Sequence, residues 1–265
     1  MRATLRVARE AARVGAADHR AMYTWRTWTF GWFARVLAEV SFYALIGVML
    51  GSQERVAFLL VGNSVLVATT VTMFSLQSTT WERMAGTLPL LVASPTRPMV
   101  VFLGRSVVWL PDALASSLGG LVIVGSVFGL DLSMTGLAWT APILVVCVVG
   151  TYGLGTFMGA LALRWVDARN LAGGLVRSIM AVVCGAYVSI TFFPGWVGWF
   201  SKLFPATFAV RAVRAVLAGG AIGGVVDDLA WCGLVGVAWL VAAALAFTRF
   251  TRHARATGSI ELGGA

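Results

Sequence analysis

Charged side chains are scarce in this chain, and lysine is almost absent from it. Acidic and basic residues make up 12% of the 265 residues, and the 20 basic ones are nineteen arginines and a single lysine, Lys202. A loop that cradles nucleotide phosphates needs the pattern Gly-x-x-x-x-Gly-Lys-Ser/Thr. Lys202 lies in Trp199-Phe200-Ser201-Lys202-Leu203, without glycines at the required positions. The sequence therefore excludes ATP hydrolysis by a P-loop on this chain.

Histidine and cysteine are also rare. The two histidines, His19 and His253, lie in polar end segments, and no His-Glu-x-x-His pattern occurs. The three cysteines, Cys147, Cys184 and Cys232, fall inside apolar runs without metal-ligand spacing, which is typical of small buried hydrophobic residues. We therefore expect no catalytic residue, no metal site and no bound cofactor on this chain, and we do not expect it to be an enzyme.

Apolar residues, in contrast, dominate. They make up 59% of the chain, and the mean hydropathy is +0.86, which is more apolar surface than one soluble core of this size could bury. The Arg-rich first 28 residues lack the apolar centre of a cleavable signal peptide. The sequence predicts an integral membrane protein whose residues 1–265 form a single transmembrane domain.

Six apolar runs could each cross a bilayer, which takes about 20 residues per helix. They lie at about residues 30–50, 56–76, 100–130, 137–163, 171–192 and 229–247. The predicted fold class is all-α, a polytopic membrane protein with six transmembrane helices. A Gly155-x-x-x-Gly159 pattern in the fourth run suggests a close-packing face.

The segment before the first run, residues 1–28, carries arginines at helical spacing among apolar residues. The stripe consists of Arg2, Arg6, Arg9 and Arg13. This pattern predicts an amphipathic helix that lies on the membrane surface and contacts lipid headgroups. A disordered basic tail is the alternative.

Residues 193–228, between the fifth and sixth runs, contain two helix-like pieces too short to span a bilayer. The second piece begins at Phe204-Pro205 and carries Arg211 and Arg214 on one face, before Gly219-Gly220. We interpret this segment as a re-entrant helical hairpin that returns to the outer side without crossing.

The distribution of basic residues fixes the predicted orientation. With this topology, fifteen basic residues fall on the inner side and four on the outer side. By the positive-inside rule, both termini, the loop at residues 79–99 and the tail at residues 250–265 are cytoplasmic. The same rule accounts for the net charge of +9 without nucleic acid. We expect a multi-pass protein of the cytoplasmic (inner) membrane.

Three charged residues inside the predicted spans are candidates for function. Arg35 and Glu39 lie four residues apart on one helix face near the cytoplasmic end, so they form either a structural pair or a substrate-facing site. Asp112 follows Pro111, which permits a kink. It either pairs with Arg105, seven residues back, or takes part in transport.

The cytoplasmic loop between the second and third runs is the most informative stretch. Met84, Leu88 and Leu91 recur at near-helical spacing, which predicts a short helix with one apolar face, broken or bent at Pro89 and ended by Ser94-Pro95. Such a helix fits a groove on a partner protein.

The pattern Glu82-Arg83-x-x-Gly86-Thr87-Leu88-x-x-Leu91-x-x-Ser94-Pro95 resembles the corresponding loop in permease subunits of ABC-2-type exporters, and departs from that family at Pro89. The segment with Phe204, Pro205, Arg211 and Arg214 is similar to the family's outer re-entrant segment.

This resemblance implies a permease that pairs with a second permease subunit, the same or a sister chain, and with two copies of a cytosolic ATPase, which carry the ATP and Mg. It also implies that the ATPase contacts the loop, and we expect Met84, Leu88 and Leu91 to be gripped and Glu82 with Arg83 to form a polar rim. The few charges in the spans favour an amphipathic or apolar export substrate.

Two other functional classes remain open. An ion-coupled carrier would use Glu39 and Asp112 to load protons or cations, and would be active without an ATPase. A membrane scaffold without transport activity is the third.

Overall fold

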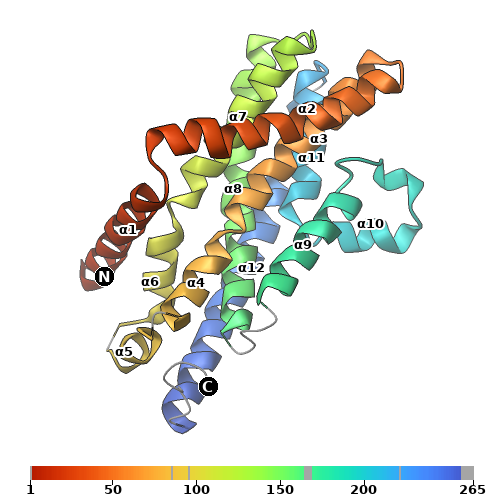
Figure 1. Ribbon diagram of the computed structural model, residues 1–265. Helices are drawn as coiled ribbons and strands as arrows, with labels where there is room; N and C mark the ends of the chain where they lie inside the picture. The colour runs from red at the N-terminus through yellow and green to blue at the C-terminus, as the bar shows by residue number, and fades with distance from the viewer. Residues whose placement is uncertain (1, 85, 95, 164–168, 221, 258–265) are drawn as a thin grey trace.

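The computed structural model describes residues 2–84, 86–94, 96–163, 169–220 and 222–257, and these residues are helical or in short connections. Figure 1 shows long helices side by side in a bundle, with α1 (Arg2–Met22) against one flank. The all-α prediction is confirmed for this part of the chain.

Five helical segments are long and apolar enough to cross a membrane. They are Thr27–Met49, Gln53–Gln77, Pro98–Val127, Met134–Ala162 and Gly223–Ala254. They coincide with five of the six predicted runs. The first consists of the π-helix η1 (Thr27–Phe33) followed by α2 (Ala34–Met49), and the last lies within α12 (Ile222–Thr257), which continues as a helix into the predicted tail.

The remaining run, predicted at residues 171–192, differs. Its helix α9 (Arg169–Val183) has 15 residues, which is short for a span, and the chain then turns at Gly185, where φ is +76°. Positive φ is a conformation that glycine adopts without strain, so Gly185 ends the helix before the apolar run ends. After it come η2 (Ile190–Phe192), α10 (Gly195–Ser201) and α11 (Pro205–Leu217).

Helix α3 (Gln53–Thr72) is the most enclosed of the five spans. Several of its polar residues are buried: Tyr187 donates to Asn63 Oδ1 at 2.7 Å, and Ser117 of α7 (Trp109–Val127) donates to the carbonyl of Ser64 at 2.7 Å. Polar side chains of one span thus satisfy polar groups of another.

The third span is interrupted where proline predicts it. Helix α6 (Pro98–Ser106) ends before Val107, and α7 begins at Trp109. Pro111 has no N–H to donate to the carbonyl of Val107, which accepts instead from Leu110 at 3.1 Å. The expected kink is confirmed, and it changes the direction in which α7 presents Asp112.

Glycines bring α8 (Met134–Ala162) and α12 into close contact. A Cβ atom on Gly236 would overlap the backbone of Gly150, and one on Gly153 would lie 2.9 Å from the carbonyl oxygen of Gly236. Gly155, for which the sequence suggested a close-packing face, lies against Ser75 of α4 (Ser75–Met84) and not against α12.

We expect Gly236→Ala to lower the melting temperature of the purified protein by several degrees, because overpacking costs roughly 1–3 kcal/mol. Gly223→Ala on the same helix is the control, since a Cβ there meets no atom within 4 Å. Equal melting temperatures for the two variants would contradict the close contact.

Candidate functional site

The predicted coupling loop, residues 79–99, comprises the end of α4, the short helix α5 (Leu88–Ala93) and the first residues of α6. In Figure 1 α5 lies toward the end of the bundle where α12 also finishes. The break between α4 and α5 falls at Gly86, where φ is +70°, and not at Pro89 as expected. Pro89 sits in the first turn of α5, where a missing N–H is tolerated. The predicted end of the helix at Ser94 is confirmed by its extended backbone.

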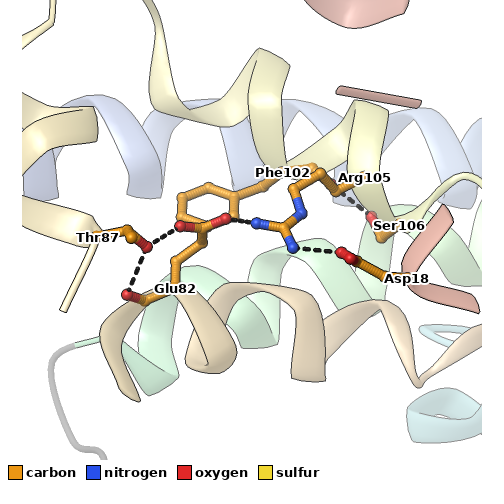
Figure 2. A network of polar contacts seen from close by, with 6 residues as sticks. All are labelled: Asp18, Glu82, Thr87, Phe102, Arg105 and Ser106. Carbon is orange, nitrogen blue, oxygen red and sulfur yellow. Dashed lines mark hydrogen bonds and ion pairs between the residues drawn. The ribbon is translucent and has the colours of Figure 1, made fainter. Parts of the chain in front are cut away.

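A network of charges, buried at Glu82 and 42% exposed at Asp18, joins this loop to the rest of the chain (Figure 2). Arg105 of α6 forms an ion pair with Glu82 of α4 and another with Asp18 of α1, at 2.5 Å. The side chains of Glu82 and Arg105 are 9% and 22% exposed. One guanidinium therefore holds three segments that are far apart in the sequence.

Thr87 completes the network from the turn between α4 and α5. Its hydroxyl lies against the Glu82 carboxylate and 3.1 Å from the Glu82 carbonyl. Because Glu82 points inward to Thr87 and Arg105, it does not form the exposed polar rim that the sequence analysis expected. The side chains of Arg83 and Met84 lie outside the described residues.

The apolar residues of α5 divide into an inner and an outer set. Leu88 is 3% exposed, and it belongs to one apolar cluster with residues of α6, α8 and α12: Val92, Phe102, Ala160, Leu163, Phe247 and Ala254. Leu91 packs against this cluster. Leu90 is 73% exposed and faces outward. Leu88 and Leu91 therefore hold α5 on the bundle, and Leu90 is an apolar side chain that α5 leaves exposed.

Helix α1 packs closely on α6 rather than standing apart. A Cβ on Gly15 would overlap the carbonyl of Arg105, and one on Gly104 would lie 2.6 Å from the Cβ of Ala11. Arg6, Arg9 and Arg13 are on the exposed side of the helix. The amphipathic helix is thus present, with small residues on its inner face and arginines on its outer face.

The intramembrane charges are partnered differently from each other. Arg35 and Glu39 form the expected pair at 3.1 Å, with 52% and 36% of their side chains exposed. Asp112 does not pair with Arg105, whose guanidinium is engaged by Glu82 and Asp18. Instead Trp28 donates to Asp112 Oδ1 at 2.7 Å, and His19 Nε2 lies 3.7 Å from Oδ2. Burial and the Asp112 carboxylate both raise the pKa of the adjacent Tyr23 phenol.

The arginines of the 193–228 segment tie it to the bundle. Arg214 donates to the carbonyls of Gly185 and Ala186 in the turn after α9 and to that of Phe58 on α3, at 2.7–2.9 Å. Arg211 forms an ion pair with Asp228 of α12. Phe204 is buried, and Pro205 begins α11, which coincides with the predicted helical piece.

The sequence did not reveal the contacts of Asp18, His19 and Trp28, and Arg105 was considered only as a partner of Asp112. Their contacts join positions more than 80 residues apart, which helical spacing cannot reveal. The small residues Ala8, Ala11 and Gly15 on one face of α1 were the available signal of a packed helix. Among the described residues, no group of three His, Cys, Asp or Glu side chains could hold a metal ion.

A bundle with several apolar helices of membrane length is the fold of a multi-pass membrane protein. The family model described as ABC-2 type transporter matches residues 18–218. The chain belongs to the ABC-2 type transporter family. Among the curated proteins, none matches it.

Proposed function

We propose that this chain is the membrane-spanning permease subunit of an ATP-driven exporter. A separate cytosolic ATPase contacts α5 and drives the conformational change by displacing it. The family supports a transport subunit that works with an ABC ATPase. The observation that carries the proposal is the double attachment of the loop, by the Glu82–Arg105–Asp18 network and by the Leu88 cluster.

The two attachments lead to different parts of the bundle. The charge network joins α4 to α6 and α1, whereas the apolar cluster joins α5 to α6, α8 and α12. A displacement of α5 by an ATPase would therefore reach the third, fourth and last spans together. Closely packed helices move as units rather than deforming, so such a push can switch the bundle between two states.

The proposed topology has six membrane passages and cytoplasmic termini. In Figure 1 α9 begins near the end of the bundle that carries α5, and α12 runs back to that end from the opposite one. The segment from α9 to α11 thus brings the chain to the outer end, although none of its helices has membrane length. Exposed aromatic residues on α10, Trp196 and Trp199, suit a re-entrant hairpin at the outer interface.

The proposed assembly contains two permease subunits, identical or sister chains, and two ATPase subunits that bind ATP and Mg. Helices α2 and α12 carry exposed apolar side chains, which in the assembly would contact lipid or the second permease subunit. An amphipathic or apolar substrate fits spans that carry so few charges.

Reconstitution tests this function directly. In proteoliposomes the chain alone is expected to hydrolyse no ATP and to move no substrate, and adding its ATPase partner should produce ATP-dependent export. Hydrolysis by the chain alone that disappears in Lys202→Ala, or ion-driven transport without an ATPase, would overturn the proposal.

A further inference from the structure

A pocket lies beside the kink of the third span, and no residue of the coupling loop lines it. The pocket has a volume of about 390 Å³ and lies between η1, the end of α1 and the start of α7. Its lining includes His19, Tyr23, Trp25, Trp28, Pro111 and Asp112. It is an open depression rather than an enclosed cavity, with room for a small organic group.

Asp112 is the acidic group of this pocket, and its charge is incompletely matched. The side chain is 4% exposed. Oδ1 accepts from Trp28, whereas Oδ2 has no hydrogen-bond donor among the described residues. The nearest basic group, His19, is at 3.7 Å, and its Nε2 has no hydrogen-bond partner either. A buried carboxylate with an unused oxygen favours a cation beside it.

The aromatic lining decides which kind of cation fits. Rings attract cations to their faces, and most strongly where the cation is poorly hydrated. Trp28 is held in place by stacking on Phe33, with ring centroids 5.3 Å apart and planes 5° apart, and by its bond to Asp112. Trp25 is 69% exposed, and Arg26 lies 5.4 Å from its ring centroid. Trp28 is therefore fixed beside Asp112, whereas the ring of Trp25 already has a cation, Arg26, next to it.

Metal ions and anions fit this chemistry poorly. A metal ion needs several ligands, and the described residues contain no cluster of three His, Cys, Asp or Glu. An anion would meet the Asp112 carboxylate, while the neighbouring Arg105 is engaged by Glu82 and Asp18.

We propose that the pocket between η1 and α7 binds a lipophilic monovalent organic cation, such as a quaternary ammonium or phosphonium group, with Asp112 as its counter-ion. This deepens the proposed function by naming a class of compound for the permease, and it rests on that function only for the statement that the compound is transported. The cation is either a free compound or the headgroup of a choline lipid.

Binding of radiolabelled tetraphenylphosphonium to the purified full chain in detergent, without any ATPase, tests the proposal. We expect saturable binding, and we expect triphenylphosphine oxide, which has similar phenyl groups and no net charge, not to compete. Equal competition by triphenylphosphine oxide would overturn the proposal, because the apolar groups alone would then explain the binding.

The matched variants are Asp112→Asn and Glu39→Gln. Asparagine keeps the acceptor for Trp28 and removes the charge, so affinity should fall about tenfold or more. Glu39→Gln removes a carboxylate from the half-exposed pair with Arg35 and should leave binding unchanged. Unchanged affinity in a folded Asp112→Asn variant would overturn the proposal.

A short-chain phosphatidylcholine distinguishes the two sources of the cation. Competition by this lipid identifies a headgroup site, and its failure to compete identifies a site for free cations. Because the assay contains no ATPase, loss of coupling in the exporter would leave these binding results unaffected, so the two proposals can fail separately.

Discussion

Replacing Leu90 by aspartate is expected to abolish copurification of the ATPase and substrate export, while the permease remains folded and abundant in the membrane. Leu90 is 73% exposed on α5 and contributes nothing to the cluster beneath it. Burying an unpaired charge in a protein contact costs a few kcal/mol, which lowers association by about a hundredfold or more. Copurification, export and the amount of protein in the membrane are the three measurements.

Two matched variants separate binding from folding. Val226→Asp places the same charge on an exposed site of α12, 54% exposed, and should affect none of the three measurements. Leu88→Asp should lower the amount of folded permease, because Leu88 is 3% exposed within the apolar cluster. Normal ATPase binding and export in Leu90→Asp would mean that the ATPase does not contact this face.

Removing the charge of Arg105 is expected to uncouple the transporter without releasing the ATPase. In Arg105→Gln the carboxylates of Glu82 and Asp18 lose their shared cation, and Glu82 is nearly buried. Breaking such a network costs roughly 1–3 kcal/mol after allowance for its partial exposure. The exposed face of α5 is unchanged, so we expect ATPase binding to persist, export to fall about tenfold and the melting temperature to drop by several degrees.

The exposed pair Arg35–Glu39 supplies the control for this experiment. Arg35→Gln breaks an ion pair whose side chains are 52% and 36% exposed, so stability should change by less than about 1 kcal/mol. If Arg105→Gln behaves like Arg35→Gln in both stability and export, the network does not link the loop to the spans.

The sequence predicted those features that depend on neighbouring residues. The kink followed from Pro111, the pair Arg35–Glu39 from four-residue spacing, and the helix at Pro205 from its periodic apolar face. Five of the six runs have membrane length because composition alone decides that property. The sixth run ends early at Gly185, a conformational effect that hydropathy does not register.

Features that depend on contacts between distant segments could not be predicted. The apolar face of the loop was assigned to a partner, but Leu88 and Leu91 pack on the chain itself and leave Leu90 outside. Pairing of Arg105 with Asp112 was one of two alternatives that their spacing allowed, but α1 places Asp18 against Arg105 and His19 beside Asp112. Periodicity identifies an apolar face, and only tertiary packing decides what covers it.

Photocrosslinking at Leu90 and Leu88 tests the central claim most directly, because these positions are two residues apart on α5 and differ in exposure, at 73% and 3%. A benzoylphenylalanine at either site is introduced into the permease coexpressed with its ATPase. The account predicts a strong crosslink to the ATPase from position 90 and little from position 88, and a stronger one when ATP is bound. No crosslink from position 90, or equal crosslinks from positions 90 and 226, would contradict the claim that the ATPase acts on the outer face of α5.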